Sequence, residues 1–253
     1  MKYKLNNIQI YIESNYEKMS KQAAYLLASQ IRLNSQSVLG LATGGTPVGM
    51  YKELVRMHKE EGLDFSQVSS FNLDEYCPIS RDNPQSYYYY MMDNLFKHIN
   101  IDTDRINIPN GNVENIEEEC KNYENKIIKA GGIDFQVLGI GNNGHIGFNE
   151  PDDKFEAFTH LVYLDEGTIE ANSRFFDSID EVPKKAISMG IKTIMLAKKI
   201  MLLANGKNKA AIIKKTIFGE ITPKVPASIL QVHPDVTFVV DEEAASEIIP
   251  LLK

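Results

Sequence analysis

Cysteine is scarce and tryptophan is missing from this chain of 253 residues, which contains two cysteines and no tryptophan. Cys77 and Cys120 do not have the spacing of a metal site, and two cysteines cannot build a disulfide framework, so the composition favours a reducing compartment. No apolar segment approaches membrane-spanning length, and the first residues lack the apolar core of a signal peptide. We therefore expect a cytoplasmic protein.

Positive charge is in the minority. The chain has 27 lysine and arginine residues against 34 aspartate and glutamate residues, for a net charge of -7. This balance argues against a general nucleic-acid-binding protein, which usually presents a basic stripe. It is compatible with a small anionic substrate, because a few basic groups and helix ends can dominate a pocket. A Walker loop, a dinucleotide fingerprint, a Gly-x-Ser-x-Gly elbow and a metal-spaced Cys/His cluster are also missing.

Strand-like and helix-like segments alternate along the whole chain. Short apolar runs at 38–42, 68–73 and 133–140 predict buried parallel strands, and amphipathic stretches at 16–33 and 113–129 predict helices. Further strands are expected near 159–164, 200–204 and 236–240, with helices near 47–58, 87–96, 208–218 and 242–252. The alternation predicts an α/β fold, a single-domain, open, mostly parallel sheet with helices on both faces, in the Rossmann-like manner.

The chain shows no internal repeat, low-complexity segment or linker rich in proline, glycine and serine. At this length one large α/β domain or two smaller domains would fit, and the uninterrupted pattern favours one domain over 1–253. The polar stretch at 152–156 and the run at 167–182 interrupt the strand and helix pattern. They predict either a mobile lid around 152–182 or ordinary surface loops.

The segment Gly141–Pro151 is the most informative part of the chain. It reads Gly-Asn-Asn-Gly-His-Ile-Gly-Phe-Asn-Glu-Pro and directly follows the expected strand at 133–140. Ligands of open α/β sheets bind beyond the carboxyl ends of the strands. His145 is a candidate acid/base group there, with Asn143 and Glu150 as polar partners that could orient it. The alternative is a turn histidine that caps backbone carbonyls.

A second turn, Thr43-Gly44-Gly45-Thr46-Pro47, connects an expected strand to a helix that should begin at the proline. Glycines let the backbone approach a ligand closely, and a helix N-terminus offers free N–H donors and the positive end of the helix dipole. The two threonines add hydroxyl donors. We therefore predict a phosphate cradle, with a plain capped turn as the alternative.

Two neighbouring carboxylates, Asp74 and Glu75, follow the expected strand at 68–73. Such a pair is costly to bury without a purpose, and one carboxylate could remove a proton from a carbon next to a carbonyl. A solvated acidic turn is the alternative. Arg174 and Lys209 could neutralise a phosphate, the arginine through two hydrogen bonds and the lysine as a point charge. As isolated residues, both are more often surface charges.

Taken together, these motifs resemble the glucosamine-6-phosphate deaminase family. The matching segments occur in the family's order over nearly the whole chain, at 41–47, 71–76, 86–87, 108–112, 141–151, 171–176, 182–186 and 206–210. The resemblance implies a metal-independent enzyme of the hydrolase class without an organic cofactor. It would convert glucosamine 6-phosphate and water to fructose 6-phosphate and ammonia in amino-sugar catabolism.

The resemblance also implies roles for particular residues. Asp74 matches the base that moves the C2 proton, and His145 matches the group that helps to open the pyranose ring, assisted by Glu150 and Asn143. The positions that match groups holding the phosphate or lining the site are Thr43, Gly44, Gly45, Thr46, Arg174 and Lys209.

Two features depart from some members of the family. Some have aspartate where this chain has Asn143, which should still accept a hydrogen bond from the imidazole but lacks the charge, so we expect retained activity with a shifted pH profile. Members activated by N-acetylglucosamine 6-phosphate have basic residues at the positions that match His160 and Val162 of this chain, and they have a longer C-terminal tail. We therefore expect no such activation, and a monomer or small homo-oligomer.

Two other functions are compatible with parts of the pattern. A hydrolase of the 6-phosphogluconolactonase type would share the fold and the phosphate group, but it would not need a base at C2. A non-catalytic sugar-phosphate sensor would usually carry an appended DNA-binding domain and could lose Asp74, His145 and Glu150, all of which this chain retains. We expect neither a nucleic-acid partner nor a membrane partner.

Overall fold

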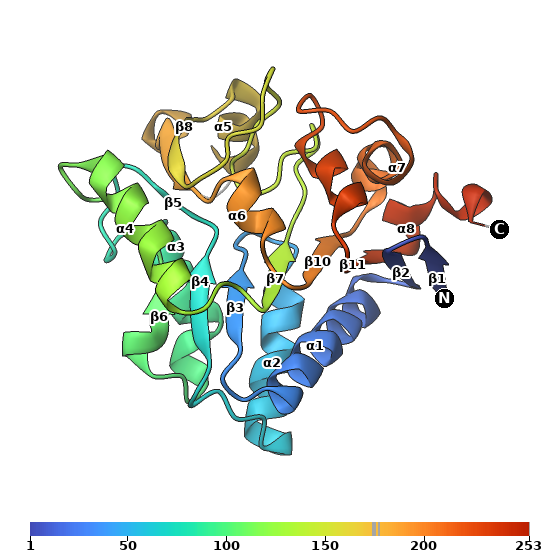
Figure 1. Ribbon diagram of the computed structural model, residues 1–253, viewed down its shortest axis with the longest axis horizontal. Helices are drawn as coiled ribbons and strands as arrows, with labels where there is room; N and C mark the ends of the chain where they lie inside the picture. Colours follow the sequence, from blue (N-terminus) through green and yellow to red (C-terminus); the bar gives the residue numbers. More distant parts are fainter. Residues whose placement is uncertain (174–175, 177, 253) are drawn as a thin grey trace.

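A mixed but mostly parallel sheet of eight strands forms the centre of the protein (Figure 1). The computed structural model describes residues 1–173, 176 and 178–252. The strand order is β1-β2-β11-β10-β7-β3-β4-β6, and every neighbouring pair is parallel except β1 with β2. The strands are β1 (Lys2–Leu5), β2 (Ile8–Glu13), β3 (Val38–Leu41), β4 (Ser69–Asn72), β6 (Ile106–Asn107), β7 (Phe135–Leu138), β10 (Ile200–Ala204) and β11 (Val236–Asp241).

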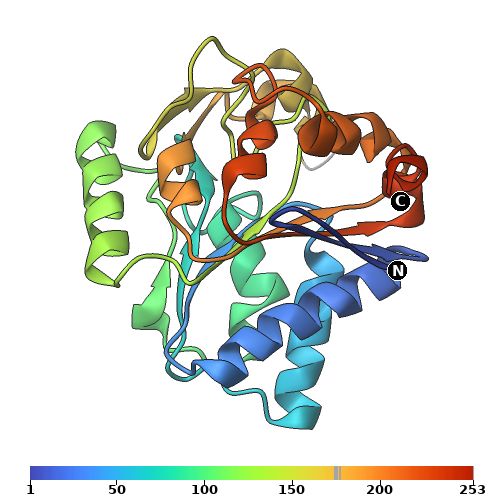
Figure 2. The same cartoon turned by 45° about the vertical axis from the view of Figure 1, so that its right-hand side comes forward.

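Helices cover both faces of this sheet. The helices are α1 (Tyr16–Leu33), α2 (Val48–Glu61), α3 (Tyr87–Asn94), α4 (Ile116–Lys129), α5 (Glu166–Asn172), α6 (Ile191–Met195), α7 (Ala210–Phe218) and α8 (Glu242–Ala245). One core cluster packs α1, α2 and α3 against the sheet, and the other packs α4, α6, α7 and α8 against the opposite face. Figure 2 shows the blue and cyan helices α1 and α2 on one side, and the orange α6 on the other.

Alternating side chains within one strand supply both layers. In β10, Met201 and Leu203 belong to the cluster under α1 and α2, whereas Leu202 and Ala204 belong to the other cluster. Successive side chains of a strand point to opposite faces, so a strand buried on both faces is apolar throughout. The α/β fold with a mostly parallel sheet and helices on both faces is confirmed.

Two N-terminal strands were missed because their sequence lacks a continuous apolar run. Ile8, Ile10 and Ile12 are buried and alternate with partly exposed residues, which is the pattern of a strand near the sheet edge. The preceding turn places Asn6 at a φ of 53°, a left-handed conformation that asparagine tolerates better than most residues. The expected helix at 242–252 is also shorter, since α8 ends at Ala245 and a separate 3-10 turn, Ile249–Leu251, contains Pro250.

A second, smaller sheet lies over the carboxyl ends of the main strands. It has the order β5-β9-β8, with β5 (Asp74–Tyr76), β8 (His160–Tyr163) and β9 (Lys185–Ser188) all antiparallel. Figure 1 shows β8 and α5 above the arrowheads of β3 and β7. The described residues of the segment at 152–182 therefore lie over that edge of the main sheet. Its movement as a lid, and the single domain over 1–253, stay predictions.

No helix in the described part of the chain is long and apolar enough to cross a membrane.

Candidate active site

A cavity of about 730 Å³ opens at the carboxyl edge of the main sheet. Its walls come from the turns that follow β3, β4, β7 and β10, which are distant in sequence but adjacent in the sheet. This is the edge at which open α/β sheets bind ligands. The predicted site residues that line the cavity are Thr43, Gly44, Gly45, Thr46, Asp74, Asn143, His145 and Lys209.

Glu150 and Arg174 differ from the other candidates. Glu150 does not line the cavity, but its carboxylate lies directly behind the imidazole of His145. Arg174 lies outside the described residues, so its predicted contact with a phosphate stays a prediction.

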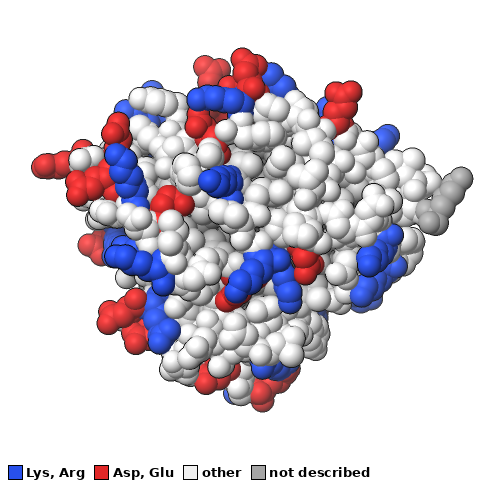
Figure 3. All heavy atoms as spheres, viewed as in Figure 1, with Lys and Arg blue, Asp and Glu red and all other residues white. Residues whose placement is uncertain are grey.

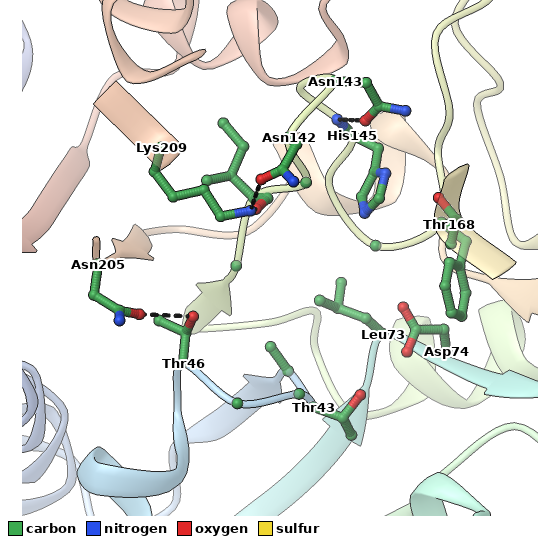
Figure 4. A pocket seen from close by; sticks show the side chains of 18 of the residues that line it. Thr43, Thr46, Leu73, Asp74, Asn142, Asn143, His145, Thr168, Asn205 and Lys209 are labelled. Carbon is green, nitrogen blue, oxygen red and sulfur yellow. Dashed lines mark hydrogen bonds between the residues drawn. The ribbon is translucent and has the colours of Figure 1, made fainter. Parts of the chain in front are cut away.

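His145 and Glu150 form a hydrogen-bonded pair. The imidazole Nδ1 of His145 lies 3.0 Å from Oε2 of Glu150. An ionised carboxylate can only accept, so Nδ1 is the donor and Nε2 is left to accept a proton when the ring is neutral. Nε2 has no hydrogen-bond partner among the described residues. Figure 4 shows the ring of His145 pointing into the cavity.

Three neighbours keep Glu150 in its ionised form. Burial raises the pKa of this carboxyl group, but the hydrogen bond and charge of His145, together with hydrogen bonds from Thr168 and Asn143, outweigh burial and bring the pKa below 4.5. Thr168 Oγ1 donates to Oε1 at 2.6 Å, and Asn143 Nδ2 donates to Oε2 at 2.7 Å. The pair therefore has a fixed acceptor behind the imidazole.

Asn143 is placed differently from our expectation. Its Oδ1 accepts the backbone N–H of His145 at 3.2 Å instead of a hydrogen bond from the imidazole. The same side chain donates to Glu150. Asn143 thus holds the loop backbone and the carboxylate, because one amide can accept through its oxygen and donate through its nitrogen.

Two glycines allow this loop to come close to its neighbours. A Cβ at Gly141 would lie 2.4 Å from the imidazole of His145, so any larger residue would displace the ring. Gly147 has a φ of 56°, and a Cβ there would lie 3.0 Å from Ser188 Oγ and 3.6 Å from Asp74 Oδ2. The loop that carries His145 therefore lies directly beside the carboxylate of Asp74.

Asp74 is a desolvated carboxylate that faces the cavity. It is only 6% exposed, and its side chain has no hydrogen-bond partner among the described residues. Burial, and after it the charge of Glu75, raises the pKa of Asp74 to about 8. A carboxylate with a raised pKa is a stronger base than an ordinary aspartate, which suits the removal of a proton from carbon.

Glu75 points away from the cavity and has a structural partner. Its carboxylate accepts the backbone N–H groups of Tyr76, Tyr87 and Tyr88 at 2.8–2.9 Å, and so it caps the N-terminus of α3. Burial raises the pKa of Glu75 to about 7, although these three hydrogen bonds oppose the rise. The adjacent carboxylates thus have different environments, and only Asp74 is available to a ligand.

The other end of the cavity has hydrogen-bond donors and a lysine that could bind an anion. The turn at 43–46 faces Lys209, whose Nζ donates to the Ile140 carbonyl at 2.8 Å and to Asn142 Oδ1 at 2.7 Å. Thr46 Oγ1 donates to Asn205 Oδ1 at 3.0 Å. Figure 4 shows Lys209, Asn205 and Thr46 at one end of the cavity, and Asp74 and His145 at the other.

Sequence reasoning missed several polar residues of the site. Asn205 follows the last residue of β10, so the same rule that singled out Asp74 at a strand end could have found it. Asn142 was noticed only as part of a loop and not as a partner of Lys209. Thr168 could not have been found, because only the tertiary structure brings α5 to Glu150.

His145 and Asp74, which line this cavity, can transfer protons to and from a bound anionic ligand. No group of three or more histidine, cysteine, aspartate or glutamate side chains with the geometry of a metal site occurs in the described part of the chain. On the face shown in Figure 3, basic side chains are scattered among acidic and uncharged ones, so positive charge is not gathered into a stripe there. The cavity itself, with one lysine and the first turn of α2, is the place that fits an anion.

Comparison with protein families matches residues 13–239 to glucosamine-6-phosphate isomerases/6-phosphogluconolactonase. The chain is 63% identical over 241 residues to a glucosamine-6-phosphate deaminase of Clostridium botulinum (strain Loch Maree / Type A3), covering 95% of this chain and 99% of the relative. A glucosamine-6-phosphate deaminase of Clostridium acetobutylicum is 62% identical over 238 residues, or 94% of this chain and 99% of the relative.

Solved structures agree with this assignment. A monomeric glucosamine-6-phosphate deaminase superposes with a TM-score of 0.92 at 49% identity, covering 94% of this chain and 99% of that one. A 6-phosphogluconolactonase of Trypanosoma cruzi superposes with a TM-score of 0.76 at 20% identity, covering 98% and 99%, and shares the fold. The chain therefore belongs to the family of glucosamine-6-phosphate isomerases and 6-phosphogluconolactonases.

Proposed function

We propose that this protein is a glucosamine-6-phosphate deaminase, which converts glucosamine 6-phosphate and water to fructose 6-phosphate and ammonia in amino-sugar catabolism. One observation carries the proposal. A desolvated Asp74 and the His145–Glu150 pair lie at one end of a single cavity, and an anion cradle with Lys209 lies at the other. A sugar phosphate bound by its phosphate would present its first carbons to the acid/base groups. Relatives with this name at 63% and 62% identity support the assignment.

Ring opening falls to His145. The anomeric hydroxyl loses a proton to Nε2 while the ring oxygen receives one, and the C1–O5 bond breaks to give the open-chain aldehyde. Glu150 stabilises the imidazolium that forms in between, because its Oε2 accepts a hydrogen bond from Nδ1 at a distance of 3.0 Å. Ring opening thus needs only a proton shuttle held in one orientation.

Isomerisation falls to Asp74. The aldehyde acidifies the proton on C2, and the ionised carboxylate removes it to give an enolamine, which is then protonated at C1. The substrate's ammonium group on C2 would lie near this carboxylate. Its positive charge favours the ionised form of Asp74 and so opposes the burial that raises the pKa of this carboxyl to about 8. Binding of glucosamine 6-phosphate would therefore favour the ionised form of Asp74, which acts as the base.

Release of ammonia completes the reaction. Protonation at C1 leaves an imine at C2, water adds to that carbon, and ammonia departs to give the ketone of fructose 6-phosphate. Each step moves protons between positioned groups, so we propose that the enzyme needs neither metal nor organic cofactor. A lactone hydrolase would not use the base at C2, and the likeness of this chain to the 6-phosphogluconolactonase of Trypanosoma cruzi, at 20% identity, supports the fold alone.

The decisive assay measures both products from glucosamine 6-phosphate in the presence of EDTA. Wild type should release ammonia and fructose 6-phosphate in equal amounts, and Asp74→Asn should release neither. No turnover by folded wild type would contradict the proposal, and hydrolysis of 6-phosphogluconolactone would then be measured. Turnover that disappears with EDTA would contradict the metal-independent mechanism.

We also propose a cytoplasmic enzyme that acts as a monomer or small homo-oligomer. A monomeric deaminase is 49% identical to this chain, which supports a small assembly. Light scattering across a range of protein concentrations tests this proposal, and a stable hexamer would contradict it.

A further inference from the structure

The turn at 43–46 has free backbone donors and occupied backbone acceptors. The N–H groups of Gly44, Gly45 and Thr46 have no hydrogen-bond partner among the described residues. The carbonyl oxygens of Ala42, Gly44 and Gly45 each accept a hydrogen bond from a tyrosine hydroxyl. The turn therefore offers N–H donors to a ligand, while the carbonyl groups of Ala42, Gly44 and Gly45 are bound to tyrosines.

The three tyrosines come from three different helices. Tyr51 of α2 donates to the Ala42 carbonyl at 2.5 Å, and Tyr90 of α3 donates to the Gly44 carbonyl at 2.7 Å. Tyr16, the first residue of α1, lies 3.2 Å from the Gly45 carbonyl. Its hydroxyl also accepts the N–H of Gly49 at 2.8 Å, and so its single proton is directed at the Gly45 carbonyl.

These contacts matter because a glycine turn has little intrinsic preference for one peptide orientation. Gly44 has a φ of 98°, and a Cβ at Gly44 or Gly45 would meet no atom within 4 Å, so packing does not fix either residue. A flipped peptide would present a carbonyl oxygen, which repels an anion, in place of an N–H donor. The bound carbonyls of Ala42, Gly44 and Gly45 belong to the same peptides as the N–H groups of Thr43, Gly45 and Thr46. A tyrosine hydroxyl on each of these three carbonyls therefore opposes a flip of that peptide.

We propose that Tyr16, Tyr51 and Tyr90 are positioning residues for the substrate's phosphate group, because they hold three carbonyl groups of the 42–45 backbone away from it. The same three peptides then keep their N–H groups available to the phosphate. The inference rests on the proposed function for the identity of the anion. The tyrosines act through the backbone and need not touch the phosphate.

The test compares Tyr90→Phe and Tyr16→Phe with Tyr89→Phe. Tyr89 lies on the same helix as Tyr90, is 44% exposed, and its hydroxyl has no hydrogen bond among the described residues, so it is a matched control. Tyr51 is fully buried, and its variant is left out because it could fail to fold. Binding of inorganic phosphate is measured by calorimetry, and steady-state kinetics are measured with glucosamine 6-phosphate.

Loss of one hydroxyl should weaken phosphate binding about fivefold and raise KM in parallel, with kcat within about twofold of wild type. The Tyr89 variant should match wild type in both measurements. An unchanged phosphate Kd in both folded variants would overturn the inference, as would a fall in kcat with unchanged Kd. Phosphate binding that depends on Tyr90 in an enzyme that does not turn over glucosamine 6-phosphate would instead contradict only the proposed function.

Discussion

Replacing Asp74 by asparagine should remove most of the activity and make the protein more stable. Asparagine has nearly the same shape as aspartate but cannot ionise, and Asp74 has no hydrogen bond among the described residues that the change would break. Its pKa rises from 3.8 to about 8 on folding, because burial and the charge of Glu75 disfavour the ionised form. Below about pH 8 the folded protein therefore keeps a proton on Asp74 that the unfolded chain releases above about pH 4, and this difference opposes folding near neutral pH.

The stability gained by Asp74→Asn should depend on pH. A carboxyl group whose pKa is raised by folding stabilises the folded state only while it is protonated, so this stability is lost as pH rises from about 4 to about 8. At about 1.4 kcal/mol per pH unit, the upper bound at pH 7 is about 4 kcal/mol. Water in the cavity and relaxation around the charge reduce this value, and we expect a gain of about 1–3 kcal/mol, or about 5 °C in Tm.

Thermal unfolding of wild type and Asp74→Asn at several pH values between 4 and 8.5 measures this gain. The difference in Tm should be small at pH 4 and should increase up to about pH 8. Asp82→Asn, at an exposed aspartate, serves as the control and should show no such trend. A difference that stays flat with pH, or a variant less stable than wild type at pH 8, would refute the reasoning. Turnover should fall by about 10²–10⁴-fold, since the base is lost.

Three further predictions concern the imidazole pair and regulation. Asn143→Asp should retain activity but shift one limb of the pH profile of the rate. A second carboxylate beside Glu150 disfavours ionisation of both carboxyl groups. A pH series in which neither limb moves would contradict this prediction. Thr168→Val should lower kcat/KM about tenfold and move the acidic limb of the pH profile to higher pH, because Glu150 loses a hydrogen-bond donor that lowers its pKa. Thr168→Ser keeps the hydroxyl and should resemble wild type. Equal effects of the two substitutions would argue against this role of Thr168. N-acetylglucosamine 6-phosphate should leave the substrate saturation curve unchanged, and a change from sigmoidal to hyperbolic kinetics would overturn that expectation.

The sequence predicted the main sheet well where strands are buried on both faces. The expected strands at 200–204 and 236–240 match β10 (Ile200–Ala204) and β11 (Val236–Asp241) closely, because such strands are continuous apolar runs. It failed at β2 and at two strands of the small sheet, β5 and β9, although the expected strand near 159–164 matches the third, β8 (His160–Tyr163). The pattern of β2 is a short alternation, and β5 contains Asp74 and Glu75, which have low strand propensity and are held there by pairing with β9.

Sequence by itself determined which chemical groups this protein has and at which strand ends they lie. The order of buried strands places the Thr43–Thr46 turn, Asp74 and His145 at the same edge of a parallel sheet, and this follows from topology. The sequence could therefore indicate a phosphate site and an acid/base pair before any coordinates were known.

Tertiary structure alone decided how those groups behave. The raised pKa of Asp74 depends on burial. The hydroxyl of Thr168 reaches Glu150 only because α5 lies over the sheet edge. Asn143 accepts a hydrogen bond from the backbone of its loop instead of from the imidazole. Tyr16, Tyr51 and Tyr90 meet one turn from three helices. Desolvation and hydrogen bonds between distant segments depend on distances of a few ångströms, which local sequence patterns do not encode.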